Sequence, residues 1–158
     1  MNLKNLLKND GAVSISIGFI LMFTVTVIVF TATILSFYSL SQSNERTAMG
    51  ATFKIIGAGL AARINTADIL VNITNSYGGT VNTLEYEFSM PASVAGRSYA
   101  VNVTGSPSEI IIQSDNGAIT YSPFNVSTNL TPIQIYSGAE NYKITYNKSV
   151  SNLSIVEQ

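Results

Sequence analysis

Six asparagines stand in the pattern Asn-x-Ser/Thr, the acceptor sequence for N-linked glycan and the clearest chemistry that this chain offers. They are Asn72, Asn102, Asn125, Asn129, Asn147 and Asn152. Asn129 is the weakest acceptor because Pro132 follows its Thr131. A strand with Asn, Ser and Thr on its wet face and Ile, Val or Leu on its core face produces the same triplet without any modification. The number of triplets nevertheless favours glycan on at least one site of an outer surface.

Catalytic and metal-binding chemistry has little support. The chain has no His and no Cys, which removes imidazole bases, thiol nucleophiles and thiolate zinc sites together. Glu85 and Glu87 point to one face of an expected strand, where a solvated face is a far better interpretation than an acid/base pair. Two oxygen-bearing pairs lack the spaced ligand loop that calcium requires: Asp115 with Asn116, and Glu140 with Asn141. We therefore predict no enzyme activity, no metal site and no cofactor.

Charge is sparse along the whole chain. Charged residues make up 11% of the sequence and the net charge is −1. No cluster of Lys or Arg could follow a phosphate backbone, so binding to nucleic acid has no support. At 158 residues, with the first part taken by an apolar run, the chain has room for one globular domain.

The apolar run predicts a membrane anchor. No residue from Gly11 to Asn44 is charged, and Ile17 to Leu40 is almost wholly apolar. About 20 apolar residues in a helix cross a hydrocarbon core of about 30 Å, whereas the apolar core of an ordinary secretory signal has only about 7 to 15 residues. Lys4 and Lys8 precede the run. The positive-inside tendency therefore predicts a single-pass protein of the cell membrane, with a cytoplasmic N-terminus and an extracellular C-terminal domain.

Beyond the run, the pattern predicts that the helix continues to about Leu70. Five apolar residues recur at helical spacing: Met49, Phe53, Ile56, Leu60 and Ile64. This stripe has two interpretations that the sequence leaves equal. It is either core against a β-rich head or a surface between subunits.

After Leu70 the pattern alternates with period two, and turn residues separate the short runs. Tyr77-Gly78-Gly79 and Asp115-Asn116-Gly117 are hairpin signals, because Gly readily adopts the positive φ of primed turns. The expected strands are Ile69 to Thr74, Thr80 to Phe88, Tyr99 to Val103, Glu109 to Gln113, Ala118 to Tyr121, Ile133 to Tyr136, Tyr142 to Tyr146 and Val150 to Val156. Short strands at this spacing indicate a small antiparallel β-sandwich, so the predicted class is α+β with a long N-terminal transmembrane helix.

The predicted organisation has four parts. Residues 1–11 form a short cytoplasmic leader, and residues 12–44 form the transmembrane helix. Residues 45–70 extend that helix, and residues 71–158 form the extracellular β-sandwich.

The start of the apolar run carries a resemblance to a known family. Ala12-Val13-Ser14, followed by Ile17-Gly18, resembles the N-terminal signature of archaeal type IV pilins and related pilin-like surface proteins. The motif positions are Ser14, Ile17 and Gly18. The resemblance implies that a membrane peptidase cuts between Gly11 and Ala12, and that the freed helix packs with its copies in a filament core. Many type IV pilins carry a Glu where this chain has Ser16.

Two functions follow as hypotheses. The first is a membrane-anchored, pilin-like surface protein, a structural or filament subunit that associates with itself or with other pilin-like subunits through its N-terminal helix. The second is an anchored accessory module of a surface motility or secretion machine, whose head contacts a protein of the cell-wall layer. Processing to Ala12 favours the first function, and an intact Met1 favours the second. In both, the lipid bilayer is the first partner.

Overall fold

The computed structural model describes residues 10–138 and 141–157, with side chains from residue 14 onward. Helix α2 (Asp10–Ser76) precedes eight strands in the described part of the chain. The chain divides into two compact units, Met1–Ser43 and Asn44–Gln158, which are described separately below. Residues 1–9 and Glu140 lie outside the described residues, and so do the predictions made for them.

The apolar segment is helical because nothing in its sequence interrupts a helix. It contains no Pro and only one internal Gly, Gly18. Four Thr residues bond their hydroxyl groups back to the helix, and their Oγ1 atoms donate to the carbonyl oxygen four residues earlier at 2.8–2.9 Å: Thr24, Thr26, Thr31 and Thr33. These side chains therefore keep their polar hydrogens satisfied within the helix itself.

The helix ends later than the sequence pattern indicated, and the predicted strand from Ile69 to Thr74 is wrong. Helix α2 continues to Ser76 because Ala67 and Val71 extend its buried face at helical spacing. Gly78 then adopts φ +78°, and the Gly79 amide donates to the Thr74 carbonyl at 2.9 Å. Gly in the left-handed region after the last turn is a common helix terminator. The Gly-Gly pair therefore caps a helix and does not close a hairpin.

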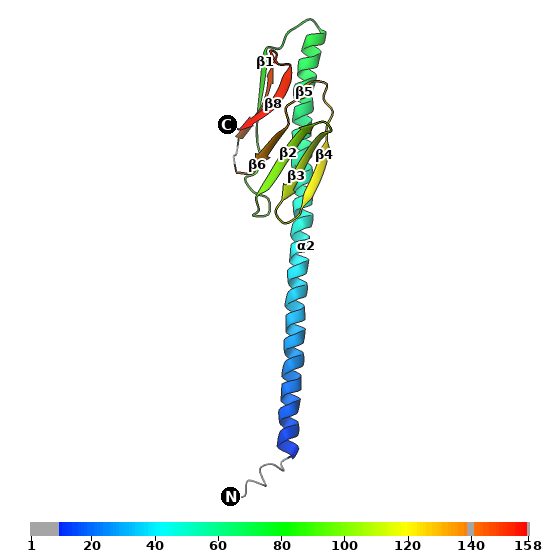
Figure 1. The fold of residues 1–158 in the computed structure, drawn as a ribbon, viewed down its shortest axis with the longest axis vertical. Coiled ribbons are helices and arrows are strands. Elements are labelled where there is room, and N and C mark those ends of the chain that lie inside the picture. Colours follow the sequence, from blue (N-terminus) through cyan, green and yellow to red (C-terminus); the bar gives the residue numbers. More distant parts are fainter. Residues whose placement is uncertain (1–9, 139–140, 158) are drawn as a thin grey trace. The chain divides into compact units, whose positions relative to one another are not determined.

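The eight strands form two sheets of four strands each (Figure 1). One sheet has the order β1-β7-β8-β5, built from Thr83–Ser89, Asn141–Asn147, Asn152–Glu157 and Asn129–Leu130. The other has the order β4-β3-β2-β6, built from Ile119–Pro123, Ser108–Ser114, Tyr99–Gly105 and Ile133–Tyr136. All pairs are antiparallel except β5 with β8, which is parallel. The predicted α+β fold with a small sandwich is confirmed.

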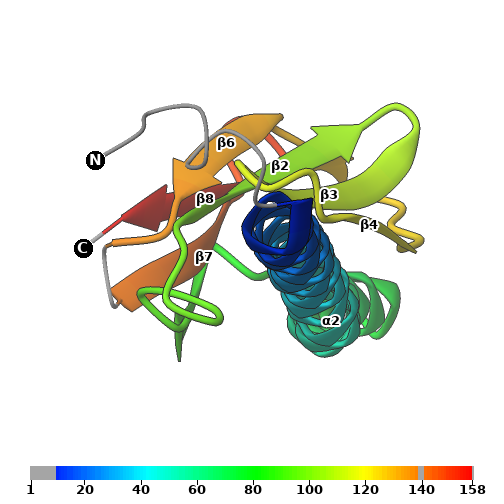
Figure 2. The same ribbon diagram turned by 90° about the horizontal axis from the view of Figure 1, so that it is seen from below.

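The sheets and the second part of α2 share one core, and strands β2, β3 and β7 lie near the helix in Figure 2. Met49, Phe53, Leu60 and Ile64 are fully buried, so the apolar stripe is core and not a surface between subunits. The sheets contribute side chains that are equally buried, among them Val101, Val103, Ile110, Ile112, Tyr142, Ile144 and Leu153. Each fully buried large apolar side chain contributes about 1.5–3 kcal/mol.

At Gly57 the helix lies very close to one sheet. A Cβ atom added there would lie 2.2 Å from Ser122 Oγ and 2.9 Å from Ser122 Cβ, both on β4. The second distance is the important one, because Ser122 Cβ is fixed to the backbone and cannot rotate away. Only a hydrogen atom in place of a side chain lets the helix and β4 lie this close.

Substituting Gly57 and Gly59 tests this contact with a matched pair. We expect Gly57→Ala to lower the free energy of unfolding by about 1–3 kcal/mol, the usual cost of overpacking. We expect Gly59→Ala to raise it by about 0.5–1 kcal/mol through helix propensity, since no atom lies within 4 Å of the added Cβ. Urea unfolding of the full chain in detergent measures both. Equal effects of the two substitutions would contradict the close approach.

Candidate functional site

The first candidate site is the apolar segment of α2. Every side chain from Ser14 to Ser41 is exposed, including Phe19 at 72% and Met22 at 73%. Within the described residues, α2 is the one helix long and apolar enough to cross a membrane. An uninterrupted surface of this kind is unfavourable in water and favourable in hydrocarbon, where the helix satisfies its own backbone hydrogen bonds.

The pilin-like motif residues all lie in the first turns of this helix. Ser14, Ile17 and Gly18 are helical, and a Cβ atom added at Gly18 would meet no atom within 4 Å. Gly18 therefore leaves an open notch in the helix surface, of the kind that lets a second helix come close. Gly11 and Ala12 are also helical, and their side chains lie outside the described part. Cleavage between them stays a prediction.

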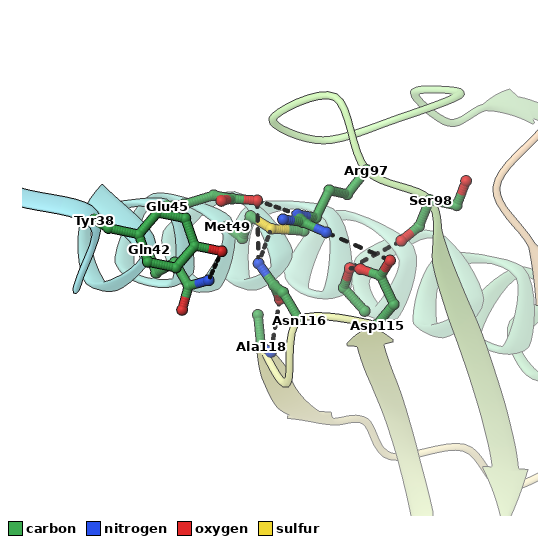
Figure 3. Close-up of polar contacts among 10 residues, drawn as sticks. Tyr38, Gln42, Glu45, Met49, Arg97, Ser98, Asp115, Asn116 and Ala118 are labelled. Carbon is green, nitrogen blue, oxygen red and sulfur yellow. Dashed lines mark hydrogen bonds and ion pairs between the residues drawn. The ribbon is translucent and has the colours of Figure 1, made fainter. Parts of the chain in front are cut away.

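The second candidate site begins at the first charged residue after the apolar run. Glu45 on α2 accepts a hydrogen bond from Arg97 Nε, and Arg97 Nη1 lies 3.6 Å from Asp115 Oδ2 (Figure 3). Asn116 Nδ2 donates to Glu45 Oε1 at 3.4 Å and contacts Met49 Sδ at 3.0 Å. We call Glu45, Arg97, Asp115 and Asn116 the Glu45 cluster. It joins α2 to two loops of the sandwich.

Two tight turns position these side chains next to the helix. Val94 and Arg97 exchange two backbone hydrogen bonds at 3.0 Å across Ala95 and Gly96, which both have positive φ. This turn presents Arg97. The predicted turn at Asp115-Asn116-Gly117 is confirmed between β3 and β4, with Gly117 at φ +84°. The Gly117 amide donates to the Ser114 carbonyl, and neither Asp115 nor Asn116 has positive φ, so this is a type I turn followed by a left-handed Gly, a common hairpin connection.

Charge pairing shifts the titration of the cluster. The hydrogen bond from Arg97 holds the pKa of the Glu45 carboxyl below its ordinary value of 4.5, and the positive charge of the guanidinium acts in the same direction. Glu45 in turn raises the pKa of Arg97. The pair is therefore fully ionised at neutral pH and shares a partly exposed site, where it positions loops more than it stabilises the fold.

Among the described residues, the other acids that the sequence singled out also lie beside basic side chains. Glu85 on β1 accepts a hydrogen bond from Lys143 Nζ on β7 at 2.9 Å, and this contact raises the pKa of Lys143. Glu87 stands opposite Lys143 in the register of the same two strands. Asp115 belongs to the Glu45 cluster. Among the described residues, no group of three or more acids could hold a metal ion.

The structure spreads the six Asn-x-Ser/Thr asparagines over the sandwich and its helix and does not bring them into one site. Asn125, Asn129 and Asn147 are exposed, and the others are half-buried. Their positions are α2 for Asn72, β2 for Asn102, the loop after β4 for Asn125, β5 for Asn129, the end of β7 for Asn147 and the start of β8 for Asn152.

Sequence reasoning missed the Glu45 cluster. Glu45 and Arg97 are far apart in the chain, and no local pattern pairs them. The available signal was indirect: Glu45 is the first charge after a long uncharged run, and Ala95-Gly96 offers a tight turn next to Arg97. Neither observation identifies the partner.

Together, these features define a class: a β-sandwich that packs on the second part of a long helix whose first part is apolar and exposed. A family of unknown function, DUF7266, matches residues 8–156, and the chain belongs to that family. No curated protein and no solved structure matches the chain. The long apolar helix followed by β-sheets is compatible with the architecture of pilin-like proteins.

Acid sensitivity tests the Glu45 cluster. Because the folded state lowers the pKa of Glu45, the unfolded chain takes up its proton first as the pH falls, and the contribution to the free energy of unfolding is lost as the pH passes the folded-state pKa. We expect Glu45→Gln and Arg97→Met to flatten the loss of stability between about pH 5 and pH 3. Urea unfolding in detergent at each pH measures this. An unchanged acid dependence in both variants would argue against the pair.

Proposed function

We propose that this protein is a membrane-anchored, pilin-like surface protein that displays its β-sandwich outside the cell and has a structural role. The observation that carries the proposal is the exposure of every side chain from Ser14 to Ser41. The resemblance of Ser14, Ile17 and Gly18 to the archaeal pilin signature adds to it. The proposed role needs no reacting group, in keeping with a chain without His or Cys.

Association through the apolar helix is the proposed mechanism. Lipid covers the exposed apolar side chains, and the Thr hydroxyl groups bond within their own helix. Gly18 leaves an open notch, so van der Waals packing between two such helices can bring their backbones close together there. The proposed partners are further copies of this chain or other pilin-like subunits.

One observation favours a second candidate function. Ser16 is uncharged, whereas a buried carboxylate at that position would fix the register between neighbouring subunits by pairing with a terminal amine. Without that pair, the protein would serve as an anchored accessory module of a surface machine. Its sandwich would then contact a protein of the cell-wall layer.

Paired arginine substitutions test the anchor. We expect Val25→Arg combined with Val29→Arg to move the protein from the membrane fraction to the soluble or aggregated fraction, since each Arg in the middle of a span costs about 2.5–3.5 kcal/mol on insertion scales. Ile55→Arg combined with Ile69→Arg adds the same charge at positions that are 75% and 53% exposed on the second part of α2. This control should stay with the membrane through an alkaline wash. If both double variants leave the membrane fraction, or if neither of them does, the proposal is contradicted.

The mature N-terminus separates the two candidate functions. We expect N-terminal sequencing of protein from the membranes of its source cells to begin at Ala12, and we expect protease added to intact cells to digest the sandwich. A chain that keeps Met1 but exposes its sandwich would reject the filament role and support the accessory module. A sandwich protected in intact cells would reject both.

A further inference from the structure

The six acceptor triplets differ in one structural respect that their sequences do not reveal. At Asn147, the side-chain Oδ1 accepts a hydrogen bond of 2.9 Å from the backbone N–H of Ser149, which closes an Asx-turn. Asn147, Lys148 and Ser149 are all exposed; Asn147 is the last residue of β7, and the other two lie in the connection to β8. Among the described residues, the Asn147 Nδ2 group has no hydrogen-bond partner. The reacting nitrogen and the Ser149 hydroxyl therefore share one open, local turn.

Local hydrogen bonding disfavours the other exposed triplets. At Asn125, the N–H of Ser127 already donates to Asp68 Oδ2 at 3.0 Å, so an Asx-turn cannot form without breaking that bond to a buried carboxylate. At Asn129, the N–H of Thr131 donates to the Leu153 carbonyl at 2.9 Å.

The three half-buried triplets are held inside regular elements. The hydroxyl of Thr74, which belongs to the Asn72 triplet, donates to the Leu70 carbonyl at 2.8 Å within α2. Asn102 lies inside β2, which is paired with β3 on one side and β6 on the other. At Asn152, the Nδ2 group itself donates to Thr131 Oγ1. In each case, the backbone of the triplet or the Asn Nδ2 group that would react already takes part in hydrogen bonding.

We infer that Asn147 is the principal N-glycosylation site of this protein. The inference rests on the proposed outer location of the sandwich. The glycan donor is a saccharide linked through its anomeric carbon to a polyprenyl phosphate or diphosphate carrier, and a membrane-bound transferase supplies the catalyst. Asn147 Nδ2 attacks the anomeric carbon, the carbon–oxygen bond to the phosphate breaks, and the phosphate leaves with the electron pair. Nδ2 loses one proton to a base of the transferase, and nothing is oxidised or reduced.

The Asx-turn explains why this position is suited to the transfer. It holds the carboxamide by its oxygen and leaves the nitrogen directed away from the turn, so the folded chain need not unpair a strand or a helix to present it. A triplet inside a strand or helix must first lose backbone hydrogen bonds, which opposes the reaction. Asn147 is the last residue of β7, and Lys148 and Ser149 lie beyond the strand, so presenting this triplet disturbs at most the end of the strand.

Full-length protein produced in its source cells tests the inference by intact mass and by mass spectrometry of glycopeptides. We expect the wild type to carry glycan on the peptide that contains Asn147. Asn147→Gln and Ser149→Ala should lose the same mass, since each destroys the acceptor triplet. Ser149→Thr should keep that mass, because it preserves the triplet. Asn125→Gln is the matched control at an exposed triplet without the turn, and it should also keep the mass.

An unmodified Asn147 in the wild-type protein would overturn the inference, and so would a mass loss in Asn125→Gln equal to that in Asn147→Gln. Protease treatment of intact cells, done on the same preparation, separates this failure from a failure of the proposed function. If the sandwich is digested and Asn147 is unmodified, only the glycan inference fails. If the sandwich is protected and Asn147 is unmodified, the proposed outer location fails as well.

Discussion

Burial of one face of α2 by both sheets is the interaction on which the sandwich depends. Met49, Phe53, Leu60 and Ile64 are inaccessible to solvent, and they belong to the same cluster as the inner side chains of the two sheets. Sheets of four short strands expose a large apolar inner face, and such faces are stable only when something covers them. In this protein the helix provides part of that cover. The helix approaches β4 without a side chain at Gly57, which fixes its distance from that sheet.

The same helix changes character within a few residues. From Gly11 to Asn44 it has no charge, and at Glu45 it acquires a carboxylate whose partner is Arg97. An unpaired carboxylate in hydrocarbon is strongly unfavourable, whereas a paired one at a partly exposed site is tolerated at small cost. The Glu45 cluster therefore marks a limit along the sequence beyond which α2 is no longer suited to lipid. It also ties the turn at Ala95-Gly96 to the helix.

Periodicity alone was enough to predict the fold class, and its failures have physical causes. The spacing from Met49 to Ile64 identified the helix, and alternation placed most strands within a few residues of their observed ends. The segment from Ile69 to Thr74 was mistaken for a strand because its β-branched residues favour strands locally, while the buried Val71 keeps it helical. Strand β5 was missed because it has only two residues and Pro132 follows it closely. Strand order and the Glu45–Arg97 pair depend on contacts between distant residues, which periodicity does not encode.

The acceptor triplets also depend on contacts between distant residues that the sequence pattern does not encode. A sequence pattern of Asn, any residue and then Ser or Thr specifies which atoms are present, but not whether the backbone amide two residues later is available. At Asn125 that amide is taken by Asp68, and at Asn147 it binds the Asn side chain itself. The difference arises because Asp68, a buried carboxylate on α2, requires donors and finds them in the amides of Ser127 and Thr128. The packing of the helix on the sandwich therefore removes from the Asn125 triplet an Asx-turn that its own sequence would allow.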